Sequence, residues 1–169
     1  MKLAETLWSL VQPKPKPAPT RRAAPRARST RTYGPAAANY ERVTREMLDR
    51  YGVRVRKWRT SMSGVAMLAR TRDGREVRLI ESPRPKGPMS AAVFLHEIGH
   101  HAIGVGAVKP RCLEELRAWE FALAAMEAEG IAVTDRVRER MDRSMRYAVA
   151  KAVRRGIKRL PAELEKYTK

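Results

Sequence analysis

The segment at residues 90–103 constrains the fold more than any other part of the chain. It is largely apolar, as in a buried helix, and yet residues 96–100 read HEIGH. Residues four apart lie about 40° from each other on one face of an α-helix. His96 and His100 are therefore expected side by side, with Glu97 between them. Gly99 lies directly before the second histidine and permits another helix to pack closely.

This spacing is that of the HExxH pattern, in which two imidazoles bind one metal ion and the glutamate reaches a water beside it. All three histidines of the chain lie in residues 96–101, so a distant imidazole cannot complete the site. His101 lies about 140° from His96 around the helix and cannot reach the same ion. A third protein ligand must be a carboxylate, or less plausibly Cys112. The carboxylates of the next predicted helix are Glu114, Glu115, Glu120 and Glu127.

The run ELRAWEFA at residues 115–122 follows HEIGH and resembles the E-x-x-A-x-x-F-A pattern of the ImmA/IrrE-like branch of the gluzincin metallopeptidases. The likeness covers about residues 53–126 and is most specific at the two helices. It implies a zinc metallopeptidase with a zincin-like fold. In that fold Zn²⁺ is bound by His96, His100 and Glu115, and Glu97 is the general base. Glu114, adjacent but turned by about 100°, is the alternative third ligand.

One departure from the family lies next to this site. These families often have Asp or Asn four residues after the ligand glutamate, where this chain has Trp119. That acid or amide orients a metal-bound histidine, so in this chain the orientation of His96 or His100 must come from another residue.

The resemblance also implies two parts of a substrate site. Related gluzincins stabilise the oxyanion with Tyr, His or Arg, and we predict Tyr147 for this role. Arg143 and Arg146, on the same helix face, are alternatives. Zincins bind an extended substrate beside an edge strand, which we expect at the second strand. The predicted substrate-binding residues are Gly64, Val65, Ala66 and Met67.

Local patterns predict an α+β fold with a helix, a small antiparallel three-stranded sheet and then further helices. The helices are expected at residues 36–51, 90–103, 110–129 and 134–155. Ser90 is the expected N-cap of the second helix, and Pro161 is expected to open a last short turn. One strand begins at Val53, and strands at residues 64–69 and 77–81 are joined by a hairpin at Asp73-Gly74. The sheet is expected to pack on the active-site and ligand helices.

Composition divides the chain into four segments. Residues 1–11 are expected to form a short amphipathic docking helix, and residues 12–35 a basic Pro-rich linker. Residues 36–130 are the predicted minimal zincin catalytic domain. Residues 131–169 are a basic helical extension, expected to pack on that domain.

The formal net charge of +18 is concentrated in the two flanks of the chain. Such charge favours a nucleic acid or an acidic protein as a partner, beside a peptide or protein substrate. It keeps open two alternatives whose metal site does not cleave: a basic nucleic-acid-associated or structural protein, and a peptidase-like sensor module.

The single cysteine excludes an intramolecular disulfide and fits a reducing compartment. The sequence contains neither an apolar run of about 18 residues nor a clear secretory signal. A cytoplasmic protein without a membrane span is therefore expected, and its oligomeric state stays open.

Overall fold

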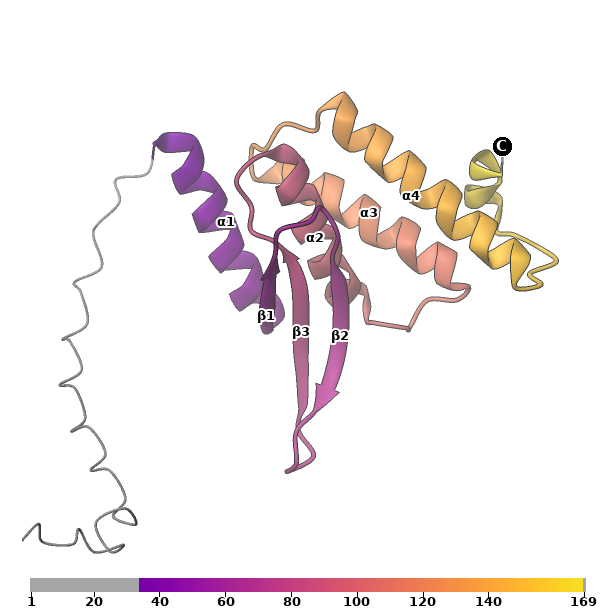
Figure 1. Ribbon diagram of the computed structural model, residues 1–169, viewed down its shortest axis with the longest axis horizontal. Helices are drawn as coiled ribbons and strands as arrows, with labels where there is room; N and C mark the ends of the chain where they lie inside the picture. Colours follow the sequence, from indigo (N-terminus) through magenta and orange to yellow (C-terminus); the bar gives the residue numbers. More distant parts are fainter. Residues whose placement is uncertain (1–33, 169) are drawn as a thin grey trace, which may run out of the picture. The chain divides into compact units, whose positions relative to one another are not determined.

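The computed structural model describes residues 34–168, which form helices packed around one small sheet (Figure 1). The elements in chain order are α1 (Pro35–Tyr51), β1 (Val53–Arg59), β2 (Val65–Arg70), β3 (Glu76–Pro83), α2 (Pro88–Ile103), α3 (Arg111–Ala128), α4 (Asp135–Arg154) and the 3-10 helix η2 (Ala162–Tyr167). The α+β class is as predicted. The docking helix predicted at residues 1–11 and nearly all of the linker predicted at residues 12–35 lie outside the described residues.

The three-stranded sheet is mixed, so the prediction of an antiparallel sheet is wrong. β3 lies in the centre, pairing antiparallel with β2 and parallel with β1. The hairpin signal at Asp73-Gly74 correctly predicts the β2–β3 pair. A short connection joins β1 to β2, but these two strands are not neighbours in the sheet. The connection passes the end of β3, which lies between them. β3 takes the central place because its last four residues, 80–83, are all buried, and a central strand can pair its backbone groups along both edges.

Helix α2 packs between the sheet and α3 (Figure 1). Every residue from 90 to 101 is buried, which agrees with the apolar sequence of the segment. The helix begins earlier than predicted, at Pro88, so Ser90 is not the N-cap. Ser90 lies in the first turn, where its Oγ accepts hydrogen bonds from the backbone N–H groups of Lys86 and Gly87 at 2.9 and 3.2 Å.

Helices α2 and α3 come into close contact at Gly99. A Cβ atom at this position would lie 2.8 Å from the carbonyl oxygen of Ala118 and 3.1 Å from its Cα. Both atoms belong to the backbone of α3, so they cannot move aside without moving the helix. The prediction that Gly99 permits close helix packing is confirmed. This contact holds residues 96–100 against the first half of α3.

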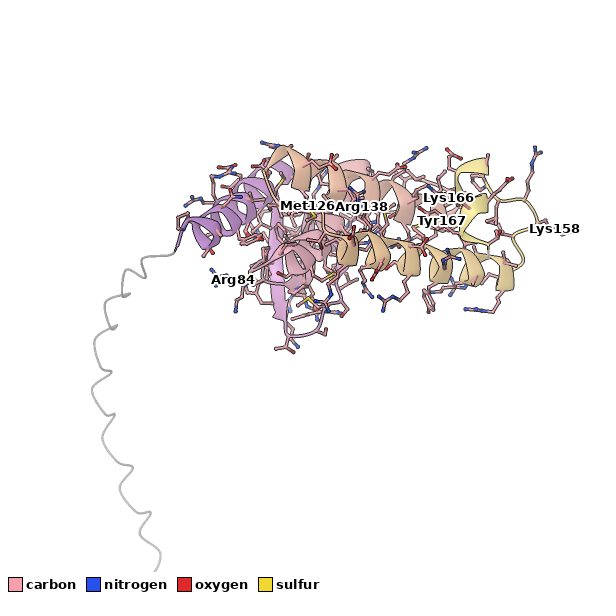
Figure 2. The ribbon with its side chains drawn as sticks, turned by 90° about the horizontal axis from the view of Figure 1, so that it is seen from above. Arg84, Met126, Arg138, Lys158, Lys166 and Tyr167 are labelled. Atoms are coloured by element: carbon pink, nitrogen blue, oxygen red, sulfur yellow. The ribbon has the colours of Figure 1, made fainter. Side chains whose placement is uncertain are left out.

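Helix α4 packs on α3 and α2, and η2 folds back against α4. The face of α4 that turns to the core buries Val137, Met145 and Val149. Figure 2 shows Lys166 and Tyr167 of η2 beside α4, and the Tyr167 side chain is buried there. The short turn predicted after Pro161 is this η2 helix. Within residues 34–168, the helices are too short or too polar to cross a membrane.

Candidate metal centre

Three side chains with metal-binding atoms meet where α2 passes the first turns of α3. The Oε2 atom of Glu115 lies 3.3 Å from Nε2 of His96 and 3.6 Å from Nε2 of His100. One donor atom from each residue lies within 4.8 Å of the other two. Both imidazoles are buried, and the carboxylate is partly exposed. These are the three residues that the family resemblance names as ligands.

Two of the three donor separations match tetrahedral coordination of a single metal ion. Bonds of about 2.0–2.1 Å at tetrahedral angles separate two neighbouring ligand atoms by about 3.3 Å. The two separations from Glu115 Oε2, 3.3 and 3.6 Å, are close to this value. His96 and Glu115 also line a cavity, which leaves one side of such an ion open to a water or a substrate.

Glu114 orients His100 and is not one of the three grouped donors. Its Oε1 lies 2.9 Å from Nδ1 of His100, and its Oε2 accepts a hydrogen bond from the backbone N–H of Gly106 at 3.1 Å. A carboxylate can only accept, so Nδ1 of His100 must donate. In the neutral imidazole that a metal ion requires, the lone pair of His100 is then on Nε2, the atom that faces Glu115. The fully buried Glu114 thus supplies the orientation that Trp119 cannot give.

His96 is held in a different way, by its ring. The rings of His96 and Trp119 lie 4.6 Å apart between centroids, tilted by 34°. Nδ1 of His96 and Nε1 of Trp119 are both buried without a hydrogen-bond partner within the described part of the chain. Packing therefore fixes the plane of this imidazole, whereas a hydrogen bond fixes that of His100.

Metal binding needs neutral imidazole and ionised carboxylate, and the surroundings favour these forms at His96 and Glu115. Burial lowers the pKa of His96, which keeps this ring neutral. Burial alone would raise the pKa of Glu115, but the favourable interaction with the two neighbouring imidazoles, His100 and His96, outweighs burial and holds the pKa well below its usual range. At His100 burial lowers the pKa, but Glu115 outweighs burial and the net pKa is raised, so a metal ion would have to displace a proton from this imidazole.

Glu97 lines the same cavity as His96 and Glu115, and burial raises its pKa to about 7. Gly64, just before β2, packs directly against its side chain. A Cβ at Gly64 would lie 2.4 Å from Oε1 and 2.5 Å from Cγ of Glu97. The absence of a side chain at Gly64 therefore leaves the space that the Glu97 carboxylate occupies.

The cavity has a volume of about 960 Å³, and α4 forms one of its walls. Tyr147 lines it and is 63% exposed, and Arg143 lines it as well. Arg146 is not among the lining residues, and its Nε donates to Asp142 at 2.6 Å. The two remaining candidates for oxyanion stabilisation are thus in the cavity that contains Glu97.

The predicted substrate strand, β2, is an edge strand of the sheet. Of its four predicted substrate-binding residues, Gly64 lines the cavity. The lining does not include Val65, Ala66 or Met67, which continue along the sheet away from it.

The other residues considered as possible metal ligands lie outside the group of three donors. Nε2 of His101 lies 3.0 Å from the carbonyl oxygen of Leu79, to which it donates, so this histidine ties α2 to β3. Glu120 pairs with Arg117 on the surface of α3 at 2.8 Å. Cys112 lines the cavity but is not part of the donor group.

Sequence reasoning missed the role of Arg111. Its Nε donates to Glu115 Oε1 at 3.1 Å, and its Nη1 lies 3.3 Å from Glu114 Oε1. The arginine thus lies against both carboxylates that serve the histidines. The signal was present, because residues three and four apart on a helix are neighbours, and Arg111 precedes the two glutamates at these spacings.

Comparison of the chain with protein-family models, with curated proteins and with solved structures gives no significant match.

Proposed function

We propose that the chain is a zinc-dependent metallopeptidase that hydrolyses peptide bonds. The observation that carries the proposal is the arrangement of His96, His100 and Glu115. Their donor atoms are spaced like the ligands of a tetrahedral ion, beside a cavity that also contains Glu97. Two imidazoles and one carboxylate with an accessible fourth side are the ligand set typical of catalytic zinc sites.

The bound metal would lower the pKa of a water molecule and polarise a peptide carbonyl. Glu97 accepts the proton of the attacking water and transfers it to the leaving amine. Its position supports this role, because it is adjacent to the first ligand and borders the cavity. Gly64 keeps the carboxylate in place by direct contact. Glu114 and Trp119 hold the two imidazoles in the orientation that binding requires.

The oxyanion of the tetrahedral intermediate needs a donor from across the cavity. We assign this role to Tyr147, with Arg143 one turn earlier on α4 as the alternative. Both side chains line the cavity from α4, opposite the metal-binding helices. A substrate in this cavity passes Gly64 at the start of the edge strand β2, where strand addition supplies backbone hydrogen bonds.

A test of the proposal combines metal analysis with one substitution. The wild-type protein is expected to contain about one zinc per chain and to cleave a denatured protein or a peptide library. Glu97→Gln is expected to keep the zinc and lose cleavage, since the amide cannot accept the proton. Glu127→Gln, an exposed glutamate on α3, is the control and should keep both.

The result that would reject the proposal is a wild-type protein without bound zinc. Zinc together with no cleavage of any peptide would instead favour the sensor-like alternative. Cleavage that persists in Glu97→Gln would show that another residue is the base.

A further inference from the structure

The cavity has a strongly basic wall, and apart from Arg143, the alternative oxyanion donor, the proposed chemistry does not use its cations. The side chains of α4 and of the residue that caps its C-terminal end contribute four cations to the lining. They are Arg140, Arg143, Lys151 and Arg155. The acidic residues of α4 (Asp135, Glu139 and Asp142) are all outside the lining. One side of α4 therefore turns only positive charge toward the metal centre.

Some cations of these helices are held in ion pairs. Three cations of the wall are not, and within residues 34–168 the same is true of Arg136, Arg138 and Arg154 outside the cavity. Arg146 pairs with Asp142, and Arg117 pairs with both Glu120 and Glu163. By contrast, Arg143, Lys151 and Arg155 have no ion-pair partner within residues 34–168. Arg140 donates to the carbonyl of Met62 at 3.1 Å, which ties α4 to the segment before β2. Lys151 Nζ lies over the Tyr147 ring, 5.9 Å from its centroid, which leaves its charge without an ionic partner. The three cations without an ion pair are thus available to an anionic ligand.

The carboxylates that line the described cavity are Glu97 and Glu115, and both belong to the proposed metal centre. A bound dication would balance these two charges. The positive charge of the α4 wall then has no counterpart inside the cavity. Unpaired charge beside a binding site attracts a ligand of opposite sign and disfavours one of the same sign.

We propose that the cavity selects peptides with acidic side chains next to the scissile bond, and that Arg143, Lys151 and Arg155 determine this preference. The inference rests on the proposed peptidase function, for which it names the substrate class. Arg143 and Arg155 are separated by about 18 Å along the helix. An extended peptide covers this length with about five residues. The preference therefore extends over several substrate positions.

The lining favours a peptide over a nucleic acid. Val93, Ala148, Ala152 and Ile157 provide apolar surface between the cations, which suits side chains of a peptide. Single-stranded nucleic acid is bound by rows of exposed aromatic rings. Of the aromatic residues in the lining, Trp119 is buried against His96 and only Tyr147 is exposed.

The decisive experiment measures binding separately from cleavage. It uses zinc-loaded Glu97→Gln protein, which should bind a peptide without cutting it. Two fluorescein-labelled eight-residue peptides are compared by fluorescence anisotropy in low salt. One carries four glutamates and the other has glutamine at the same positions. We expect the acidic peptide to bind roughly tenfold more tightly, and the difference to shrink as salt is added.

Two triple variants with the same change of net charge locate the effect. R143Q/K151Q/R155Q removes the unpaired cations of the wall and should abolish the preference for the acidic peptide. R136Q/R138Q/R154Q removes three exposed arginines of α4 that lie outside this cavity and should leave the preference intact. Arg138 is labelled on α4 in Figure 2. Lys151→Gln alone should give a smaller loss and serves if the triple variant does not fold.

Three results would overturn the inference. The first is equal affinity for the two peptides. The second is an equal loss of affinity for the acidic peptide in both triple variants. The third is an oligothymidylate of equal charge that displaces the acidic peptide and binds more tightly. Failure of the proposed function looks different. In that case charge-dependent binding persists, but zinc-loaded wild type cleaves neither the acidic peptide nor any member of a peptide library.

Discussion

The two sides of the cavity differ in how their charges are held. On the side of α2 and α3, the charged groups of the metal centre are in contact with one another. His100 is bound to Glu114, Glu114 to Gly106, and Arg111 contacts both glutamates. On the side of α4, three cations have no ion-pair partner in the described structure. Tyr147 there is 63% exposed.

The contrast separates two tasks within one cavity. Groups that must keep a fixed position are buried and held by several neighbours, because small displacements of reacting groups are costly. Groups that meet a variable ligand are exposed and free to adjust, because their interaction acts at longer range. Substitutions on the α2 and α3 side should therefore change metal binding and chemistry. Substitutions on the α4 side should change the choice of substrate.

The largest effect is expected for Glu115→Ala. The substitution removes one of three donors, so bound zinc should fall from about one per chain to near zero after dialysis. Atomic absorption measures the zinc content. Glu120→Ala on the same helix is the matched control. It removes a surface carboxylate that pairs with Arg117 and should leave the zinc content unchanged. Full zinc in Glu115→Ala would contradict the assigned ligand set.

That His96, His100 and Glu115 lie close together could be predicted from the sequence, because both histidines are on one helix with clear periodicity and the resemblance names the glutamate. Helical spacing places His96 beside His100 whatever the rest of the fold. The ligand glutamate came from the family resemblance. The hairpin of β2 and β3 was also predictable, since its turn is local.

The parts that were not predicted depend on contacts between distant segments. The parallel pairing of β1 with β3 is decided by which strand is buried deepest, and local spacing does not encode this. The role of Glu114 required its distance to His100 and to the loop at Gly106. The sequence indicates only that the C-terminal flank is basic. That its cations line the cavity of the metal centre follows from the position of α4, which depends on tertiary packing.

Gly64→Ala should lower turnover by about 100-fold while the protein keeps its zinc. The new methyl group would overlap the side chain of Glu97, which must then leave its position. The metal ligands are on other segments and stay in place. Gly34→Ala, where a Cβ has no neighbour within 4 Å, is the control and should behave as wild type. If Gly64→Ala turns over normally, the position of Glu97 does not depend on this contact.

Glu114→Gln should weaken zinc binding between about 10- and 100-fold, as expected for loss of a group that orients a metal-bound histidine. The amide keeps the volume of the side chain. The amide, however, has one acceptor oxygen and one donor NH2 group. Its NH2 must therefore face another donor, either Gly106 N–H or His100 Nδ1–H. Competition with a chelator measures the affinity. An unchanged affinity would mean that His100 is oriented by packing alone, as His96 is.

The smallest effect is expected for His101→Phe, on the same helix as the ligands but on its other side. The phenyl ring fills the same space, and the hydrogen bond to the carbonyl of Leu79 is lost. The free energy of unfolding should fall by about 1–3 kcal/mol, because a partly buried acceptor loses its donor. The zinc content should stay at one per chain, in contrast to Glu115→Ala. Denaturant unfolding and metal analysis of one preparation give both values. If zinc is lost without a loss of stability, the functional side of α2 includes His101, and the division between a chemical face and a structural face of this helix is wrong.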